Sequence, residues 1–381
     1  MTRSVLFRVG LVVFALLFAA CQQTTASPSA APSGPTQSAA TSPSADASPS
    51  EPASASAPAT AAPAGAVLDA VKSRGRLICG INGSLTGFSV IEGTGATGFD
   101  ADYCKAVAAA VFGDPDAVEF RAVNADQRGP ALQTREVDVL IRNTTWTVTR
   151  DTTWGLFGPT TFYDGQGMMV RQSVGASTLE DLAGSTICVQ SGTTTELNLT
   201  DRMRELGVTF TPQVFADIDP TYQAYDEGRC DAVTSDRSQL VSRRSGFANP
   251  SEHILLDEVM SKEPLGPVTP LGDDAWFNVV KWTVFATIEA EELGITQANV
   301  ADQAGTSTNP VVLRLVGAEG ELGAQLGLEN DWIVDVITAV GNYGEIFERN
   351  VGPDTPLALE RGQNNLWNAD EPGLLYAPPY R

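Results

Sequence analysis

The sequence predicts an α/β fold of two similar lobes, each a mostly parallel sheet flanked by helices, with a C-terminal helical extension. Short apolar segments alternate with helical segments from residue 76 onward, which is typical of parallel strands that are covered on both faces. The order of these segments in 76–143 is repeated in 185–236, which indicates a second lobe and a ligand cleft between the two.

The first lobe is predicted to comprise residues 66–164 and 262–381, including the extension. It begins with an apolar strand at 76–82 and a helix at 99–113 that a glycine ends. A strand at 117–123, a helix at 126–137 and a strand at 138–143 complete the alternation.

The second lobe is predicted to comprise residues 165–261. Its strands are expected at 167–171, 185–191, 208–215 and 230–236, with helices at 194–207 and 220–228. The chain would cross between the lobes near 163–167 and 261–266, which would form a hinge. A long helix follows at 273–294, with Trp276, Val280, Val284 and Ile288 on one face.

The N-terminal segment reads as a targeting signal. Arg3 and Arg8 flank an apolar run that is too short to span a bilayer comfortably, and two alanines then precede Cys21. This arrangement resembles a bacterial lipobox, so we expect residues 1–20 to be a lipoprotein signal peptide and Cys21 to be lipidated. The alternative is an ordinary secretory signal with an incidental cysteine. Residues 21–65 are rich in Ser, Ala and Pro and are expected to form a disordered tether.

Charge and cysteine content limit the function classes. The net charge of −22 argues against nucleic acid and against broad contact with an anionic membrane surface. In an exported chain, Cys79 with Cys104 and Cys188 with Cys230 would form two disulfides, each local to one half of the fold. Four buried free thiols are the alternative.

A catalytic function finds few suitable residues. The single histidine, His253, lies in a segment that we expect to be far from the cleft, so no Ser-His-Asp or Cys-His set can be assembled without it. No cluster of metal ligands and no phosphate-binding loop is present in the sequence. We therefore expect no enzyme activity, no metal and no cofactor.

Polar residues follow the strand at 138–143. Asn143, Thr145 and Arg150 would together hold a small carboxylate, because arginine binds it in a bidentate manner and the other two add donors. The alternative for Arg150 is a surface ion pair with Asp151.

A second polar segment, 191–196, follows the strand at 185–191. Ser191, Thr193 and Thr194 would present hydroxyl groups beside the free N–H groups of a helix N-terminus, which suits an anion. The alternative is that Thr193 and Glu196 form a capping box that needs no ligand.

Asp236 ends the strand at 230–236 and would meet an ammonium group. A ligand with a carboxylate and an ammonium on one carbon, as in an amino acid, would satisfy all three segments. The alternative is that Asp236 only caps the helix that follows it.

Long strings from residue 66 onward match a known family. They are "GFDADYCKAVAAAVFGD", "VDVLIRNTTWTVTRDT", "YDGQGMMV", "CVQSGTTTELNL", "GRCDAVTSDRSQL", "SKEPLGPV" and "NYGEIFERNVG". With these strings the chain resembles the amino-acid ABC transporter substrate-binding proteins (periplasmic binding protein family 3), specifically the general L-amino-acid-binding branch. The resemblance implies a two-lobed type II periplasmic-binding-protein fold that closes over one L-amino acid.

The resemblance also implies roles for single residues. Arg150 would clamp the α-carboxylate with Thr145 and Thr194, Asn143 would stand at the same rim, and Asp236 would take the α-ammonium.

Two further positions concern the side chain of the ligand. Arg128 falls where some glutamate and aspartate binders contact a side-chain carboxylate, although a surface helix arginine is equally consistent with the pattern. Asn82 stands where those binders have a second arginine, which implies a broader ligand set that includes amides.

Partners and location follow from the same resemblance. We expect a monomer outside the cytoplasm, anchored to the cell membrane through lipid on Cys21, that delivers its ligand to an ABC permease with a cytoplasmic ATPase. The alternatives are a dehydratase-like enzyme on the same bilobal fold, which needs acid and base groups in the cleft, and an amino-acid sensor, which needs a transmembrane helix after the domain.

Overall fold

The structure, a computed structural model, describes residues 66–381. The predicted signal peptide, Cys21 and the tether lie outside these residues. None of the helices in the described part of the chain is both long enough and apolar enough to cross a membrane.

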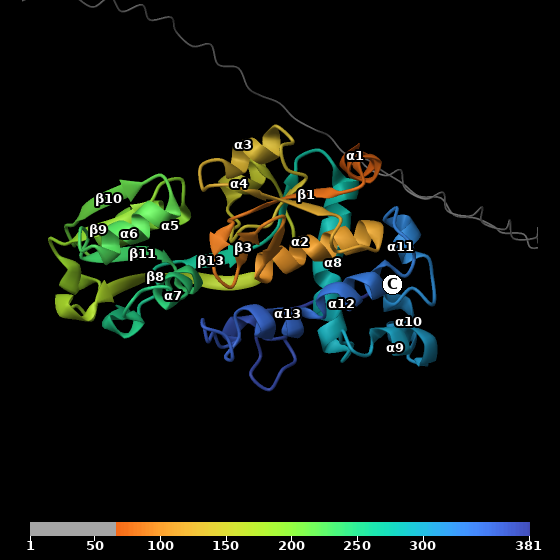
Figure 1. Cartoon of the computed structure of the whole chain (residues 1–381). Coiled ribbons are helices and arrows are strands. Elements are labelled where there is room, and N and C mark those ends of the chain that lie inside the picture. The colour runs from red at the N-terminus through yellow and green to blue at the C-terminus, as the bar shows by residue number, and fades with distance from the viewer. Residues whose placement is uncertain (1–65) are drawn as a thin grey trace, which may run out of the picture. The chain divides into compact units, whose positions relative to one another are not determined.

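A five-stranded sheet forms the centre of what we call the first lobe (Figure 1). Four of its strands, β5, β1, β6 and β7, run in the same direction, and β14 alone is antiparallel to them. The order is β5 (Val118–Ala122), β1 (Leu77–Ile81), β6 (Val139–Leu140), β14 (Val268–Pro270) and β7 (Gly155–Phe157). The helices of its N-terminal part are α1 (Ala66–Arg74), α2 (Phe99–Phe112), α3 (Arg128–Gln133) and α4 (Val148–Thr153).

A six-stranded sheet forms what we call the second lobe. The path runs β10 (Thr211–Phe215), β9 (Thr186–Gln190), β11 (Ala232–Asp236), β8 (Phe162–Arg171) and β12 (His253–Leu255), and β13 (Lys262–Leu265) also pairs with β8. Its helices are α5 (Thr194–Glu205), α6 (Ile218–Asp226) and α7 (Arg237–Ser245), with short 3₁₀ turns η1 (Gln172–Val174), η2 (Glu180–Leu182) and η3 (Pro250–Glu252).

A small three-stranded sheet of β2 (Ser84–Leu85), β3 (Ser89–Glu92) and β4 (Gly95–Thr97) precedes α2 and was not predicted from the sequence. Its strands are two to four residues long, so their apolar alternation is too short to detect. Helix α2 then ends at Gly113, whose left-handed conformation at φ 66° lets its N–H bond Ala109 O, as the glycine in the sequence predicts.

The sheets are mixed because two strands arrive directly from the other lobe. A parallel neighbour needs a crossover connection, whereas β8 and β14 come straight through the crossing segments and pair antiparallel to their neighbours. The crossing segments also pair with each other, since β13 runs antiparallel to the first half of β8. The lobes are therefore joined by a two-stranded ribbon.

The largest core cluster lies mainly in the first lobe, between the sheet and helices from the C-terminal half, and it continues into the second lobe at Cys188, Tyr225 and Val233. Helix α8 (Asp274–Glu292) buries the predicted stripe of Trp276, Val280, Val284 and Ile288. The ribbon is anchored to this core, because Phe162 at the start of β8 packs edge-on against Phe99 and stacks on Phe347.

The extension consists of helices and loops that pack on α2 and α8. The helices are α9 (Val300–Thr306), α10 (Pro310–Leu315), α11 (Leu322–Gln325), α12 (Trp332–Val340) and α13 (Tyr343–Asn350), followed by the 3₁₀ turn η4 (Gly362–Asn364). Buried Asn364 holds the ribbon: its Oδ1 accepts from Tyr163 N at 2.7 Å and its Nδ2 donates to Tyr163 O at 3.1 Å. The extension thus contacts the hinge as well as the first lobe.

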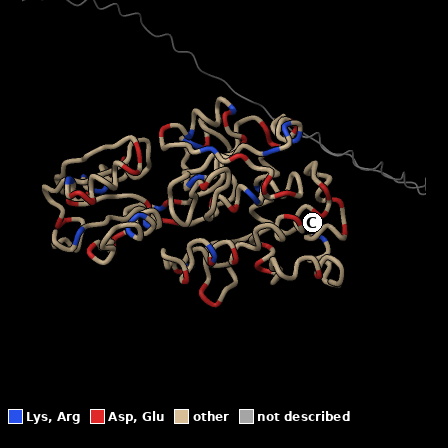
Figure 2. Tube along the Cα trace, in the orientation of Figure 1, with Lys and Arg blue, Asp and Glu red and all other residues tan. Residues whose placement is uncertain are grey.

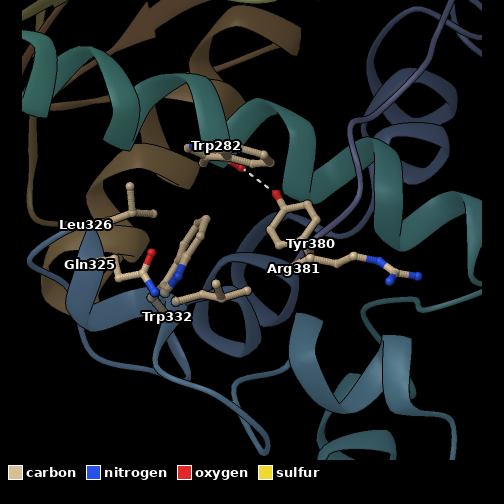
Figure 3. A pocket seen from close by; sticks show the side chains of 7 residues that line it. Trp282, Gln325, Leu326, Trp332, Tyr380 and Arg381 are labelled. Carbon is tan, nitrogen blue, oxygen red and sulfur yellow. Dashed lines mark hydrogen bonds between the residues drawn. The ribbon is translucent and has the colours of Figure 1, made fainter. Parts of the chain in front are cut away.

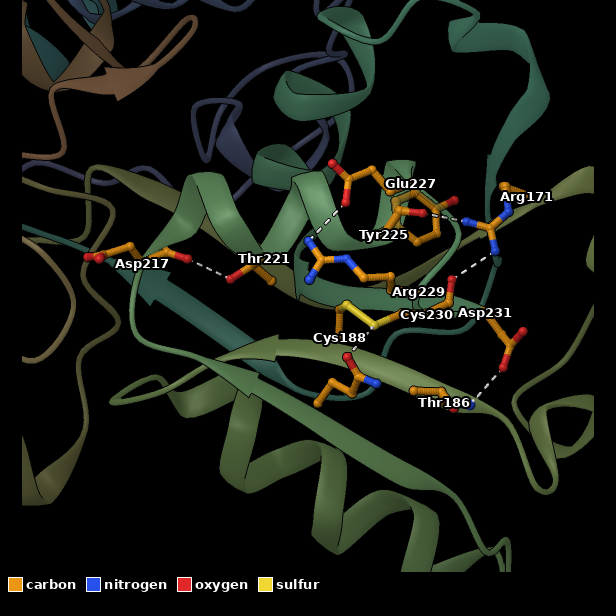
Figure 4. Close-up of a disulfide and its surroundings, with 11 residues drawn as sticks. Arg171, Thr186, Cys188, Asp217, Thr221, Tyr225, Glu227, Arg229, Cys230 and Asp231 are labelled. Carbon is orange, nitrogen blue, oxygen red and sulfur yellow. Dashed lines mark hydrogen bonds and ion pairs between the residues drawn. A yellow bond between two sulfur atoms is a disulfide. The ribbon is translucent and has the colours of Figure 1, made fainter.

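Both predicted disulfides are present. Cys79 in β1 is bonded to Cys104 in α2, and Cys188 in β9 is bonded to Cys230, just before β11. Figure 4 shows the second bond among the strands of the second lobe, where Arg171 donates to Cys230 O at 2.8 Å. Because all four cysteines are joined in these bonds, the alternative of buried free thiols is wrong.

Candidate functional site

The predicted polar segments meet in a small cavity between the lobes. The carboxyl ends of β6, β9 and β11 supply most of its side chains, which explains why residues that are far apart in the sequence converge here. The cavity volume is about 20 Å³ in this conformation. Its lining consists of Arg128, Arg142, Asn143, Thr145, Gln190, Thr193, Thr194, Thr195, Ser235, Asp236 and Gln239.

Two first-lobe arginines lie side by side against one indole. The guanidinium carbons of Arg128 and Arg150 are 5.5 Å and 4.8 Å from the ring centroid of Trp154. Trp154 reaches this position because residue 129 is a glycine, where a Cβ would lie 2.7 Å from the ring. Arg128 lines the cavity, whereas Arg150 does not.

Both guanidiniums reach across to the second lobe. Arg128 Nη2 donates to Gly192 O at 3.0 Å, and Arg150 Nη2 donates to the same oxygen at 3.4 Å. Arg150 Nη1 also donates to Thr145 O at 3.0 Å, which fixes the loop after β6. Burial lowers the pKa of each guanidinium, and for Arg128 the charges of Arg150 and Arg142 add to this lowering. The alternative interpretations of Arg128 as a surface helix arginine and of Arg150 as a partner in a surface ion pair are wrong, since these residues are only 3% and 6% exposed.

Asp236 presents a buried carboxylate to this cluster. Burial and then the charges of Asp164 and Glu263 raise its pKa well above its usual range, and Arg128 and Arg150 oppose the rise. Asp236 stands at the N-cap position of α7, but its side chain makes no capping hydrogen bond. The alternative of a simple cap is therefore wrong, and no donor to this carboxylate is found among residues 66–381.

Glu263 accepts hydrogen bonds from two threonines, Thr145 and Thr194, that were predicted to bind the ligand. Thr145 Oγ1 donates to Glu263 Oε2 at 2.6 Å and Thr194 Oγ1 donates to the same oxygen at 2.8 Å, while the two hydroxyl oxygens lie 3.3 Å apart. Glu263 belongs to β13 of the ribbon. A hinge residue thus holds one predicted ligand-binding hydroxyl from each lobe, and the predictions from the sequence did not include it.

Further contacts across the cleft hold the lobes together. Asn143 Nδ2 donates to Gln239 Oε1 at 3.0 Å, and Ser191 Oγ donates to Asp126 Oδ2 at 3.0 Å. Away from the cavity, Ser242 Oγ donates to Thr86 O at 2.7 Å. These bonds define a closed conformation.

The N-terminus of α5 combines a capping role with cavity lining. Thr193 Oγ1 accepts from Glu196 N at 3.1 Å, as a cap does, but the Glu196 side chain accepts from Gly192 N at 3.2 Å and does not complete the box. Thr193 also lines the cavity, so this one residue both caps the helix and belongs to the predicted polar lining.

A larger pocket adjoins the cavity. Its volume is about 430 Å³, and it is lined by Asn82, Asn124, Asp217 and other residues of both lobes. Arg142 and Gln190 line both spaces and so stand between them. The structure therefore puts Asn82 in the outer pocket, and Ser191, bonded to Asp126, lines neither space.

Arg142 is a residue that sequence reasoning missed. It precedes Asn143 directly, so its position at the end of the strand was a usable signal, but the outer pocket that it faces is formed only when both lobes meet. Gln190, Gln239 and Glu263 were missed for the same reason.

His253 lies in the second lobe, away from the cavity lining. It belongs to β12 and is buried, and its Nδ1 is 2.9 Å from the hydroxyl of Tyr225. Burial is the main cause that lowers its pKa. Within residues 66–381, no group of three or more His, Cys, Asp or Glu is arranged to hold a metal ion.

A separate cavity of about 110 Å³ lies in the extension (Figure 3). Its lining includes the aromatic residues Trp282, Trp332 and Tyr380, and the Tyr380 hydroxyl donates to Trp282 O at 2.9 Å. Arg381 is the single charged side chain of this lining, which lacks the convergent donors and acceptors of the inter-lobe cavity. Acidic residues are spread over the whole described trace (Figure 2).

Comparison with known proteins gives a consistent result. Residues 77–295 match the bacterial extracellular solute-binding proteins, family 3. The chain is 52% identical to a general L-amino acid-binding periplasmic protein of Rhizobium johnstonii over 324 residues, which cover 84% of this chain and 94% of that protein. It is 47% identical to a glutamate/glutamine/aspartate/asparagine-binding protein of Rhodobacter capsulatus over 322 residues, or 84% and 95% of the two chains.

One solved structure is similar over most of the described residues. It is an ABC transporter / periplasmic binding protein from Brucella ovis with glutathione bound. Its TM-score is 0.79 at 49% sequence identity, and the match covers 82% of this chain and 99% of that one.

Proposed function

Because the chain belongs to family 3 of the bacterial extracellular solute-binding proteins, we propose that it captures L-amino acids outside the cytoplasm and delivers them to an ABC import permease. Two relatives are named as binding proteins for L-amino acids in general and for glutamate, glutamine, aspartate and asparagine. Polar, acidic and amide amino acids are the ligands that this site favours.

The observation that carries the proposal is the charge arrangement of the cavity. Buried Asp236 has no donor among the described residues and lies near guanidiniums held on Trp154. A carboxylate acceptor beside fixed cations is complementary to a ligand that carries both an ammonium and a carboxylate. An α-amino acid carries both on one carbon.

Each group then has a role. Asp236 takes the α-ammonium, and Arg150 with Thr145, Asn143 and Thr194 takes the α-carboxylate. The two threonine hydroxyls donate to Glu263 in this structure and would turn from it to the ligand. Arg150 and Arg128 both donate to Gly192 O in this closed conformation. No hydrogen bond from Arg128 Nη1 or Arg150 Nε is found among residues 66–381, so each guanidinium keeps a donor for a carboxylate when the lobes are closed.

Capture then proceeds by closure. The first lobe offers its arginines, and the second lobe adds Asp236 and the N-terminus of α5 when the ribbon flexes. An amino acid shifts the population to the closed form because that form alone supplies both sets of contacts. The closed form is the one that a permease would recognise.

The remaining parts of the proposal concern location. Lipidation of Cys21 and the tether would keep a monomeric domain close to the permease, whose ATPase partner works in the cytoplasm. Glutathione is a second candidate ligand, supported by the Brucella ovis relative and by the outer pocket of about 430 Å³ beside the cavity.

Calorimetric titration of the full chain with the twenty L-amino acids tests the function. We expect one-to-one binding, weakened about ten- to hundredfold by Arg150→Ala and by Asp236→Asn, because each change removes a charge-assisted hydrogen bond. Asp201→Asn is the control, since its carboxylate is exposed and pairs with Arg204 on the surface. Binding of none of the twenty by the wild-type protein would refute the proposal.

A further inference from the structure

Two side chains stand where the cavity meets the outer pocket. Arg142 and Gln190 line both spaces, which have volumes of about 20 Å³ and 430 Å³. If the α-groups of an amino acid occupy the smaller space beside Asp236, its side chain has to pass these two residues to enter the larger one. Of the two, only Arg142 carries a charge.

Arg142 is buried with unused donors. It is 4% exposed, and its Nε donates to Val123 O at 2.7 Å. No hydrogen bond from its two terminal nitrogens is found among residues 66–381. The terminal nitrogens therefore remain free to donate to an acceptor that enters the pocket, and such charge-assisted hydrogen bonds are strong.

The neighbouring carboxylates do not satisfy Arg142. Asp100 lies close enough to favour its charge, but Asp100 Oδ2 already accepts from Asn143 N at 2.9 Å and forms no ion pair with Arg142 within the described chain. Burial is the main cause that raises the pKa of Asp100 to about 7, so this carboxyl is itself only partly charged near neutral pH. Asp236 also favours the charge of Arg142 but belongs to the inner cavity.

A second donor lines the same outer pocket. The side chain of Asn82 is 8% exposed, and its Nδ2 is buried without a hydrogen-bond partner. Its Oδ1 accepts from Ser84 N at 3.3 Å, which orients the amide and leaves the nitrogen as the free end. The first-lobe wall thus has donors from Arg142 and Asn82 without matching acceptors.

We propose that Arg142 is a specificity-determining residue that, together with Asn82, binds the carboxylate or amide oxygen at the distal end of the ligand's side chain. The inference rests on the proposed function and adds the residue that recognises the side chain of the ligand. It also revises the expectation drawn from Asn82: the positive charge for an acidic side chain is supplied from the end of β6 and does not depend on an arginine at position 82.

The test compares ligands that share α-groups but differ in side chain. The full chain and Arg142→Gln are titrated calorimetrically with L-glutamate, L-glutamine and L-alanine. We expect the variant to lose about ten- to hundredfold in affinity for glutamate, less for glutamine, and under about threefold for alanine, whose side chain cannot reach the pocket. Arg142→Lys should recover part of the glutamate affinity because it keeps the charge.

A control variant and the pattern of losses distinguish a failure of the role of Arg142 from a failure of the proposed function. Arg121→Gln removes a partly exposed arginine of β5 that pairs with Glu119, and it should leave the affinity for all three ligands unchanged. An equal loss for the three ligands in Arg142→Gln, or no loss for any, would overturn the role of Arg142 while the proposed function stands. If the wild-type protein binds no amino acid, the proposed function fails and the inference fails with it.

Discussion

The substitution Gly192→Ala should weaken ligand binding by opposing closure. Gly192 lies in the loop before α5 and meets the first lobe at Asp126: a Cβ at residue 192 would be 1.9 Å from Asp126 Oδ1 and 2.9 Å from its Cγ. Asp126 has to rotate away from this clash, which displaces the Oδ2 that accepts from Ser191 at 3.0 Å. The clash exists in the closed form alone.

The magnitude follows from these contacts. The Ser191–Asp126 hydrogen bond is exposed to solvent, where a hydrogen bond contributes about 0.5–1.5 kcal/mol, so losing it in the closed form should reduce affinity about two- to tenfold. Gly192 also has φ +69°, which costs alanine about 1–2 kcal/mol of stability whether the lobes are open or closed. Stability and affinity should therefore fall for separate reasons.

Calorimetry with L-glutamate and urea unfolding together distinguish the two effects. Gly207→Ala is a matched control, because Gly207 has φ +68° and nothing within 4 Å of its Cβ position. It should lose similar stability without losing affinity. In the Gly192→Ala background, Asp126→Ala removes the clashing atoms and should restore affinity to that of Asp126→Ala alone. Losses that simply add would refute the closure mechanism.

Binding of L-alanine should release protons at those pH values where Asp236 is protonated in the free protein, because its raised pKa falls when a bound ammonium favours the ionised form. Calorimetry over a pH series, in buffers of different ionisation enthalpy, measures this release, and Asp236→Asn should abolish it. Asn364→Ala should lower the free energy of urea unfolding by about 1–3 kcal/mol, because two hydrogen bonds to the Tyr163 backbone are lost; no change would contradict the clamp. Replacing Cys188 and Cys230 together by Ala should cost about 2–5 kcal/mol in the same assay, and a stability equal to wild type would contradict a structural role for this disulfide.

The architecture was predictable where local patterns were long. The helix expected at 194–207 is α5 (Thr194–Glu205), and the strand expected at 185–191 is β9 (Thr186–Gln190). The strand expected at 138–143 is only Val139–Leu140, because the chain turns at Asn143, whose φ of 23° lies outside strand geometry. The apolar residues of a segment do not show where its pairing with the neighbouring strand stops.

The candidate site was predictable in part, for a related reason. Asp236 and Thr194 follow strands directly, so topology brings them to the cleft, and the structure puts both in the cavity lining. Glu263 and Arg142 depend on contacts between segments more than 100 residues apart or on a pocket shared by two lobes. The spacing of residues in the sequence does not indicate contacts between such distant segments.

The placement of the disulfides has a mechanical consequence. Each covalent cross-link closes a loop inside one lobe, Cys79–Cys104 in the first and Cys188–Cys230 in the second, and the ribbon of β8 and β13 carries neither. Oxidation in an exported protein therefore stiffens two bodies separately and leaves their relative rotation unrestrained. The disulfides thus oppose the unfolding of each lobe but do not oppose the hinge motion by which the two lobes would close.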